Sequence, residues 1–410
     1  MPLDRLTRIL VEHVAGLETK GTAKGAESVV SAVIRPTGTR GPRVRLEGEG
    51  ERAFLRMNSN SYLGMSLVPE VVQAEEDAAH RYGAGPGAVR FISGSYSPHV
   101  ELETRLADFH GRDAAMIFSS AYAAFMSIIT PLTTDATVLI SDELNHNCII
   151  NAMRLARPLD KLIYKHLDMD GLDAALAQSA GRASRAIVVT DGIFSMRGDH
   201  APVDRIMKIA QRWDARFPEN VIVVVDDSHG VGAFGRTGRG TEEYTSSPPC
   251  DLLVATLGKA LGVNGGYVVS AQPVIRFLRE TCPMYIYSNP ITPGEAAAAM
   301  TALALLDSEA GLARLDRLRS LTRRFEEGLV AAGFEVIPGE HPVVPLMVRD
   351  TARTRALVDH LRASGILATG LAFPVVPRGD EEIRFQINAD HTETDIDEVL
   401  AVLRKFAASE

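Results

Sequence analysis

The stretch VIVVVDDSHGVGAFG, Val221–Gly235, joins a run of apolar β-branched residues to a glycine-rich turn that carries acids and a histidine. Such a run is typical of a strand buried on both faces of a parallel sheet. Open α/β sheets bind ligands beyond the carboxyl ends of their strands, so Asp226, Asp227 and His229 are candidate site residues. Taken alone, the same pattern also fits an aspartate that caps the next helix and a solvated histidine.

Length and composition limit the classes of protein that this chain can be. With 410 residues it is long enough for a large domain and a smaller one, and 46% hydrophobic content is typical of a globular protein. The net charge of −9 argues against a nucleic-acid-binding protein that needs a basic face.

Cysteine usage and the first residues bear on the compartment. Cys148, Cys250 and Cys282 are widely spaced and odd in number, so they indicate neither a disulfide framework nor a zinc motif. The opening MPLDRLTRIL lacks the apolar core of a signal peptide, and no stretch approaches the length of a membrane span. We therefore expect a cytoplasmic protein.

Outward from Val221, short apolar segments alternate with helical patterns. The segments are AAMIFS, TVLIS, LDKLIYK, RAIVVTDG, VIVVVDD, DLLVATLG and GGYVVS. This alternation predicts an α/β fold with a mostly parallel seven-stranded sheet wrapped by helices. We expect this large domain to span residues 61–295.

Two further regions flank the predicted large domain. We expect residues 1–60 to form an N-terminal arm, with an amphipathic helix and then short strands that lead into the large domain. Residues 296–410 begin with an alanine-rich stretch that predicts one long interdomain helix or a kinked pair. The segments FEVIP, VVPLMV and EIRFQIN and a last helix then predict a smaller α+β C-terminal domain.

Lys259 lies in CDLLVATLGKALGVNGGYVVS, just after an apolar segment and among small residues. Desolvation there would lower the pKa of its amine and make it a Schiff-base nucleophile, although a lone Gly-Lys pair more often marks a surface cation. Thr256 offers a hydroxyl suited to a phosphate oxygen. Lys259 and Asp226 at successive strand ends are what pyridoxal phosphate requires, an imine partner and a carboxylate for the pyridine nitrogen.

Other residues fit the same cofactor. The helix start in FSSAYAAF offers free amides and the Ser120 hydroxyl as an anion seat, or an ordinary N-cap. His146 could stack on an aromatic cofactor, and His229 could reach its phenolic oxygen or the imine. Arg384, on a predicted strand, could clamp a substrate carboxylate, although it could equally be a surface arginine.

With these residues the sequence resembles the α-oxoamine synthases, fold-type-I pyridoxal-phosphate enzymes that join an amino acid to an acyl-CoA. The resemblance runs from about Asn58 to His391. It is carried by NSYLGMS, GAVRFISGSYSPHVELE, SDELNHNCII, TDGIFSMRGD, VDDSHGVGAFGRTGRG, TLGKALG, YIYSNPITP, FPVVP and IRFQINADHT. Within the family, VRFISG, TLGKALG and FPVVP are most similar to glycine C-acetyltransferases.

The resemblance implies roles for residues in the cofactor site. Lys259 would form the Schiff base, Asp226 would pair with the pyridine nitrogen, and His146 would stack on the ring. His229 and Ser195 would lie near the phenolic oxygen. The implied phosphate contacts are the amides of Ala121 and Tyr122 together with Ser120 and Thr256.

It also implies substrate contacts and a homodimer. Asn60 and Arg384 would hold the substrate carboxylate, and His99 lies in the matching SGxxxxH segment. Ser288 would contact the phosphate from the partner subunit, so the active sites would be shared. Three departures from the family pattern are Ser61, Arg197 and the helix start SSAYAAF, which lacks the usual asparagine.

The function expected from this resemblance is condensation of glycine, alanine or serine with a short acyl-CoA. Lys259 would remove the α-proton, and His229 or Lys259 would handle later protons. Related alternatives are condensations with longer acyl-CoAs, like those of 8-amino-7-oxononanoate synthases or serine palmitoyltransferases. From other classes, an aminotransferase or a metal-dependent hydrolase with Asp226, Asp227, His229 and His146 as ligands stays open.

Overall fold

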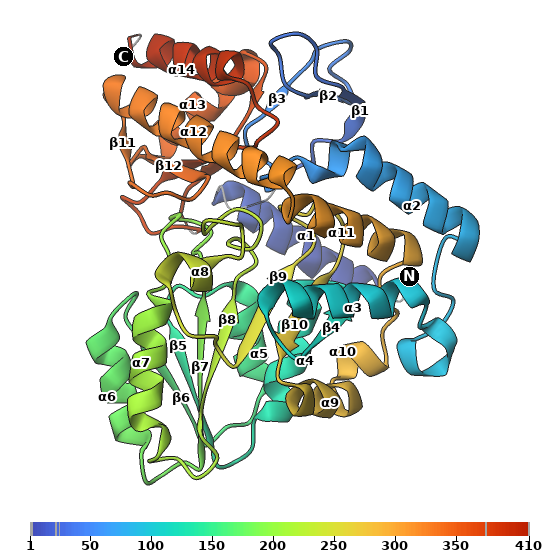
Figure 1. Cartoon of the computed structure of the whole chain (residues 1–410). Helices are drawn as coiled ribbons and strands as arrows, with labels where there is room; N and C mark the ends of the chain where they lie inside the picture. The colour runs from blue at the N-terminus through green and yellow to red at the C-terminus, as the bar shows by residue number, and fades with distance from the viewer. Residues whose placement is uncertain (1–2, 21–22, 24, 374, 409–410) are drawn as a thin grey trace.

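The computed structural model of the chain describes residues 3–20, 23, 25–373 and 375–408. A seven-stranded sheet with the strand order β4-β10-β9-β8-β7-β5-β6 forms the core of the lower part of the molecule in Figure 1. The strands are β4 (Ala114–Phe118), β5 (Thr137–Asp142), β6 (Asp160–Tyr164), β7 (Arg185–Asp191), β8 (Val221–Asp226), β9 (Leu252–Thr256) and β10 (Gly266–Ser270). β10 runs antiparallel to both of its neighbours and the other pairs are parallel, which confirms the predicted mostly parallel sheet.

Helices cover both faces of this sheet, which explains why its strands are apolar on both sides. In β8, Val223 and Val225 pack into one core cluster and Val224 into the other. The first face carries α3 (Ser97–His110), α6 (Met169–Ser179) and α7 (Val203–Asp214), and the short α8 (Thr241–Thr245) follows β8. The second face carries α4 (Ala121–Leu132), α5 (Asn147–Leu155), α9 (Gln272–Thr281) and α10 (Pro283–Ile286).

Two helices connect this sheet to a second, antiparallel one. α11 (Pro293–Leu306) and α12 (Glu309–Ala331) meet at 77°, so the kinked pair and not the single helix is formed. The second sheet has the order β11-β12-β15-β14; α12 and α13 pack against it, and α14 packs against these two helices. The elements are β11 (Glu335–Val336), β12 (Val343–Met347), α13 (Thr351–Ala363), β13 (Ile366–Leu367), β14 (Thr369–Leu371), β15 (Glu382–Gln386) and α14 (Glu393–Ala407).

The N-terminal segment lies against the C-terminal part of the chain, far from it in sequence (Figure 1). β1 (Val30–Ile34) pairs with β2 (Arg43–Leu46), and β3 (Leu55–Arg56) pairs in parallel with β13. The chain then passes through η1 (Met65–Leu67), α2 (Pro69–Tyr82) and the π-turn η2 (Arg90–Gly94). The segment between β3 and η1 thereby leads from the β3–β13 pair toward the seven-stranded sheet.

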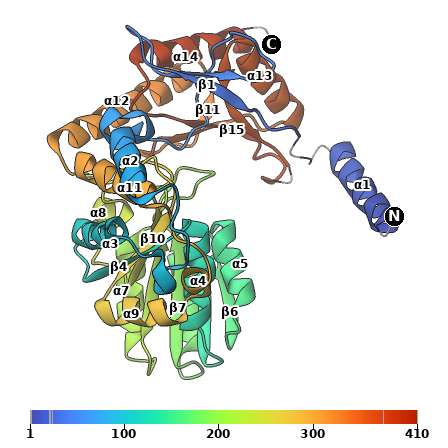
Figure 2. The same ribbon diagram turned by 90° about the vertical axis from the view of Figure 1, so that its right-hand side faces the viewer.

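Helix α1 (Asp4–Thr19) projects away from the rest of the molecule (Figure 2). None of its residues is buried, although Leu6, Leu10 and Val14 recur at helical spacing on one side. In the described part of the chain, no single helix is long and apolar enough to cross a membrane. The bent pair α11 and α12 passes that test when its two helices are taken together, by length and composition alone.

Candidate active site

A cavity of about 260 Å³ lies where β5, β7, β8 and β9 end at their carboxyl termini. Adjacent parallel strands bring their ends to one edge, so residues distant in sequence meet there. The cavity is lined by Ser120, Ala121, Tyr122, His146, Cys148, Asp191, Ile193, Ser195, Asp226, Ser228, His229, Thr256 and Lys259. The cofactor residues predicted from the sequence are therefore brought together, with the exception of Ser288.

Lys259 follows β9 in a turn that Thr256 holds in place. The Thr256 hydroxyl donates to the Gly265 carbonyl and accepts from the Gly258 amide, each at 3.0 Å. Burial lowers the pKa of the Lys259 amine to about 8, against the opposing effect of Asp226 and Asp191. A substantial fraction of this amine is thus neutral near physiological pH, as a nucleophile or proton acceptor requires.

Asp226 is the last residue of β8 and is 6% exposed. Its Oδ1 accepts from the Ser228 amide at 3.1 Å, and its Oδ2 accepts from the Cys148 thiol at 3.5 Å. Neither donor carries a positive charge. A buried carboxylate that has polar but no cationic contacts at these atoms suits a ligand that brings a cationic N–H.

His229 is held from two sides by residues that the sequence did not single out. Its Nδ1 lies 2.7 Å from the hydroxyl of Tyr62, and its carbonyl accepts from Nε2 of His341 at 2.9 Å. Burial, followed by the nearby charge of Lys259, lowers the pKa of His229 well below its usual range. The imidazole that faces the cavity is therefore neutral.

His146, the N-cap of α5, also lines the cavity. Its Nδ1 accepts from the Cys148 amide at 3.3 Å, and burial of the ring lowers its pKa. The His146, Cys148 and Asp226 ligand atoms lie within 4.8 Å of one another. Asp227, which the hydrolase alternative would need, instead accepts from the amide and hydroxyl of Thr241 at 2.7 and 2.6 Å, and it does not line the cavity.

The N-terminus of α4 supplies an anion seat at one end of the cavity. Ser120 is the N-cap, since its hydroxyl oxygen accepts from the Ala123 amide at 3.0 Å. The amides of Ala121 and Tyr122 have no partner within the helix, and the Ser120 hydroxyl proton can still be donated. A Cβ on Gly266 would lie 2.1 Å from the Ala121 nitrogen, so this approach of strand to helix needs glycine.

The donor set fits pyridoxal phosphate. The anion seat matches its phosphate, the Asp226 carboxylate matches its pyridine nitrogen, and Lys259 matches its aldehyde carbon. The Ser228 hydroxyl oxygen lines the same cavity and is buried with no hydrogen-bond partner in the described chain. An unsatisfied buried hydroxyl is costly and points to a ligand that completes the site.

The predicted carboxylate-binding residues lie beside this cavity. Nη1 of Arg384 donates to the Ser195 carbonyl at 3.0 Å. The Gln386 amide, with its oxygen turned to the guanidinium, accepts from Nε and Nη2 of Arg384 at 2.6 and 2.7 Å. Since guanidinium has five N–H donors, two remain for a carboxylate.

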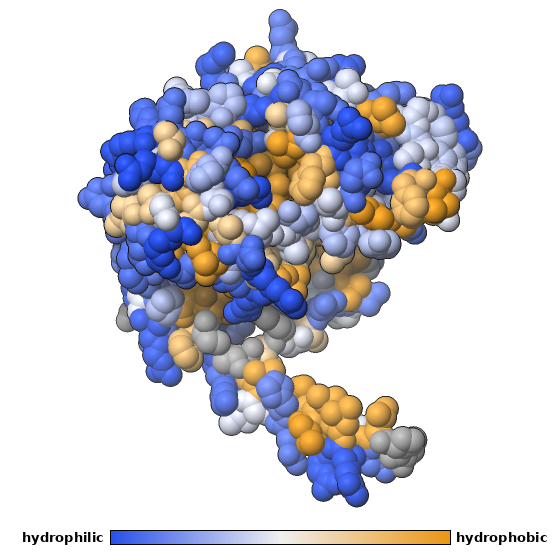
Figure 3. Space-filling view, turned by 90° about the horizontal axis from the view of Figure 1, so that it is seen from below, coloured by the Kyte–Doolittle hydropathy of each residue, from blue (hydrophilic) through white to orange (hydrophobic). Residues whose placement is uncertain are grey.

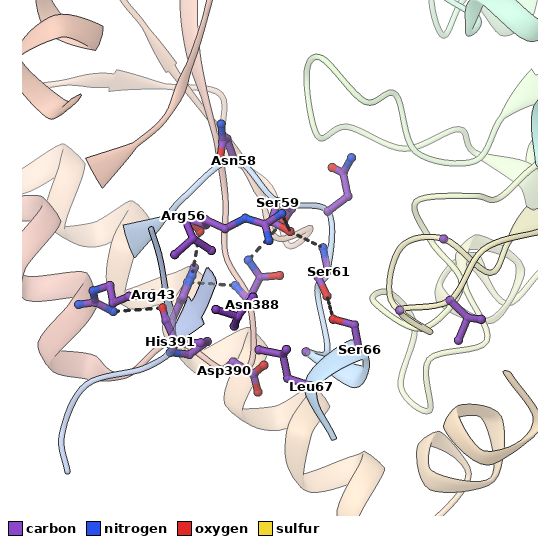
Figure 4. Close-up of a pocket in the computed structure, with 18 residues that line it drawn as sticks. Arg43, Arg56, Asn58, Ser59, Ser61, Ser66, Leu67, Asn388, Asp390 and His391 are labelled. Atoms are coloured by element: carbon purple, nitrogen blue, oxygen red, sulfur yellow. Dashed lines mark hydrogen bonds between the residues drawn. The ribbon is translucent and has the colours of Figure 1, made fainter. Parts of the chain in front are cut away.

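Asn60 lies in a neighbouring groove of about 470 Å³. Figure 4 shows that the labelled residues around this groove come from the stretch that runs from β3 through η1, from Arg43 in β2 and from the chain after β15. Gly258, next to Lys259, also lines it, so the groove and the cavity share a wall. Ser61, one of the departures, faces Ser66 here at 3.5 Å between hydroxyl oxygens.

The structure does not bring every predicted residue to the site. His99 is fully buried at the start of α3, where Nδ1 accepts from the Tyr96 amide and Nε2 donates to the Ile291 carbonyl. Neither ring nitrogen is available to a substrate, so the expected contact is not met within this chain. Ser288 is half-buried outside the cavity, and its contact from a partner subunit stays a prediction. Pro374 of the FPVVP motif lies outside the described residues.

Comparisons with known proteins agree with this geometry. A family model described as aminotransferase class I and II matches residues 52–403. An 8-amino-7-oxononanoate synthase of Symbiobacterium thermophilum is 36% identical over 401 residues, 98% of this chain and 97% of that protein. The mitochondrial 2-amino-3-ketobutyrate coenzyme A ligase of Homo sapiens is 38% identical over 397 residues, 96% of this chain and 90% of that protein.

Solved structures match over nearly the whole chain. A serine palmitoyltransferase of Sphingomonas wittichii has a TM-score of 0.86 at 25% identity and covers 99% of this chain and 98% of its own. A high-resolution structure of SPT with PLP has a TM-score of 0.86 at 26% identity, and the match covers 100% of this chain and 98% of that chain. These relatives carry the names of three different activities.

Proposed function

The chain belongs to the α-oxoamine synthases, fold-type-I pyridoxal-phosphate enzymes, and from that premise we propose that it condenses glycine with a short acyl-CoA, acetyl-CoA first. Alanine and serine are the next amino acids we expect. The acyl carbon of the thioester joins the α-carbon of the amino acid, and coenzyme A leaves as the free thiol.

The observation that carries this proposal is the position of Arg384. Its anchor, the Ser195 carbonyl, belongs to a residue of the Lys259 cavity, so an amino acid bound to the guanidinium would have its α-carbon near the Lys259 amine. The resemblance of VRFISG, TLGKALG and FPVVP to glycine C-acetyltransferases supports the short acyl chain.

Different residues of this chain have different roles in the proposed reaction. When bound, pyridoxal phosphate supplies an electron sink that stabilises negative charge on the α-carbon. Asp226 keeps the proton on the pyridine nitrogen, and Arg384 and Asn60 hold the substrate carboxylate. The neutral amine of Lys259 takes the α-proton, because its lowered pKa lies near the working pH.

We also propose a homodimer with shared sites. Figure 3 shows apolar side chains gathered along the projecting α1 helix. On the body of the chain Phe91, Ile92 and Tyr287 are 64%, 65% and 78% exposed, and Tyr287 precedes Ser288. Apolar surface of this kind marks an interaction site, and a second copy would cover it while carrying Ser288 to the neighbouring phosphate seat.

A matrix of amino acids against acyl-CoAs, read by thiol release, tests the function. Glycine with acetyl-CoA should give the highest kcat/KM, with chain-length discrimination of about 1–3 kcal/mol per methylene at most. Thiol release from long-chain acyl-CoAs alone would replace this proposal by a palmitoyltransferase-like or oxononanoate-synthase-like one. Conversion to the pyridoxamine form by amino acid alone, without thiol release, would indicate an aminotransferase.

A further inference from the structure

The hydroxyl of Tyr62 lies between two polar atoms but has one proton to donate. Tyr62 is fully buried, and its oxygen is 2.7 Å from Nδ1 of His229 and 3.3 Å from Oδ1 of Asn60. The first distance is that of a strong hydrogen bond and the second exceeds the usual range. The phenolic proton therefore belongs to the contact with His229.

Both members of this contact are uncharged. Burial lowers the pKa of His229 and raises that of Tyr62, so the pair is a neutral imidazole and a neutral phenol. A neutral imidazole carries one N–H, and the partner of one ring nitrogen decides where that proton sits. If Nδ1 accepts from Tyr62, the proton of the imidazole must be on Nε2.

We propose that Tyr62 is a positioning residue that fixes His229 as its Nε2–H tautomer, with Nε2–H presented to the cavity. This inference rests on the proposed function for its catalytic meaning, since a donor at Nε2 suits the phenolic oxygen of pyridoxal phosphate. The other tautomer would present a lone pair to that oxygen. Tyr62 itself stays neutral and transfers no proton.

His341 supplies a second constraint on the same histidine. Its Nδ1 accepts from the Val343 amide at 3.2 Å, so its Nε2 carries the proton that is donated to the His229 carbonyl at 2.9 Å. Burial lowers the pKa of His341 to about 3, which keeps this arrangement neutral. Tyr62 thus contacts the ring of His229, and His341 contacts its backbone. The Tyr62 and His341 rings also meet edge to face with centroids 5.3 Å apart, which links the two contacts.

The chain contains a matched control for Tyr62. Tyr267 in β10 is also fully buried, and its hydroxyl lies 2.8 Å from Nε2 of His110. Neither of these residues lines the cavity. Tyr267→Phe therefore removes a comparable phenol-to-imidazole hydrogen bond without touching the site.

Nitrogen chemical shifts of the histidines in cofactor-free protein give the direct test, with the His229 signals assigned by their loss in His229→Gln. Wild type and Tyr267→Phe should show protonated Nε2 and bare Nδ1 at His229, and Tyr62→Phe should show a mixture of tautomers. Protonated Nδ1 in the wild type would overturn the proposal, whether or not Tyr62→Phe folds. So would an unchanged tautomer in folded Tyr62→Phe.

Steady-state kinetics separate this inference from the proposed function. Tyr62→Phe should lower kcat about 10- to 100-fold with a smaller change in the KM for the amino acid, in the range of one positioned hydrogen bond. Tyr267→Phe should keep wild-type kcat in its folded fraction. An enzyme that is inactive with every acyl-CoA would refute the proposed function while the nitrogen shifts still decide the tautomer.

Discussion

Asp191 and Asp226 are register partners at the ends of β7 and β8, and both carboxyl groups line the same cavity. Burial, and next the charge of Asp226, raises the pKa of Asp191 well above its usual range, which favours its protonated form. Asp191 Oδ2 accepts from the His146 amide at 2.9 Å, a contact that a neutral group can make. Two adjacent acids thus hold different roles because their environments differ.

Replacement of each acid by its amide should separate these roles. Asp226→Asn should retain the cofactor but lower the rate of α-proton exchange by about 10²- to 10³-fold, since an amide cannot hold the pyridinium proton as an ion pair. Asp191→Asn keeps a neutral acceptor for the His146 amide and should change that rate less than about 5-fold. Deuterium incorporation into glycine measures both, and equal losses in the two variants would contradict this division.

Lys259 should set the pH dependence of cofactor uptake. Burial lowers the pKa of its amine to about 8, and the neutral form is the nucleophile. The rate at which cofactor-free protein takes up pyridoxal phosphate should rise about tenfold per pH unit below that value and level off above it. Stopped-flow absorbance measures the rate.

Chemical labelling identifies the amine. Borohydride reduction followed by peptide mapping should place the cofactor on Lys259. The exposed Lys208, paired with Asp204 on α7, is the control, and Lys208→Ala should leave uptake unchanged. A label on any other lysine would remove the basis for the cofactor site.

The protein should become less stable in mild alkali, because His166 loses its proton there. Burial alone would lower its pKa, but hydrogen bonds from its two ring nitrogens to Asp142 and Asp199 outweigh burial and raise the pKa to about 9. Because the folded value exceeds the unfolded one of about 6.5, the stabilisation is complete below pH 6.5 and is lost as pH rises through 9. Its upper limit is on the order of 3 kcal/mol.

Urea unfolding at pH 6 and at pH 9.5 measures this effect. Wild type should lose stability between the two, and His166→Gln should lose markedly less because it lacks the titrating group. His80, on the exposed end of α2, is the control, and His80→Gln should behave as wild type. A pH dependence that is the same in all three proteins would rule out His166 as its origin.

Arg197, one of the departures from the family pattern, also donates to Asp199, at 2.8 Å, so it belongs to the same cluster as His166, Asp142 and Asp199.

The apolar side of α1 should stabilise the dimer. Leu6 and Leu10 are 50% and 54% exposed in the isolated chain, and their replacement by glutamate places charge in the interface that we propose. Leu6→Glu with Leu10→Glu should weaken self-association by at least tenfold in sedimentation experiments. Arg8→Glu, on the opposite side of α1, should leave the association intact. A wild-type monomer with full activity would contradict the shared site.

The strands could be predicted from the sequence because they depend on local pattern, and so could the candidate residues Asp226 and Lys259 that follow them. The run Val221–Val225 indicates a buried strand by itself, and Asp226 and Lys259 follow such runs directly. The ends of parallel strands meet at one edge of the sheet, so the pattern of the two segments suffices to place Lys259 and Asp226 beside one another.

Contacts between segments that lie far apart in the sequence could not be predicted from local pattern. Tyr62 and His341 lie 167 and 112 residues from His229, and nothing in NSYLG or GEHPVV marks either as its partner. His99 is a second case, since its motif position suggested a substrate contact and did not indicate that the Tyr96 amide and the Ile291 carbonyl would occupy both ring nitrogens. Which hydrogen bonds a buried side chain makes is fixed by packing between segments.

The parallel pairing of β3 with β13 imposes an order of events on biosynthesis. The hydrogen bond from Asn58 to Thr369 spans 311 residues, a length that takes roughly 15–60 s to translate at about 5–20 residues per second. During that interval the strands of the central sheet can assemble on the ribosome while the segment that carries Asn60 and Tyr62 has no partner strand to anchor it. The segment that carries Asn60 and Tyr62 therefore gains its β13 partner only after β8, β9 and the residues Asp226 and Lys259 have all been synthesised.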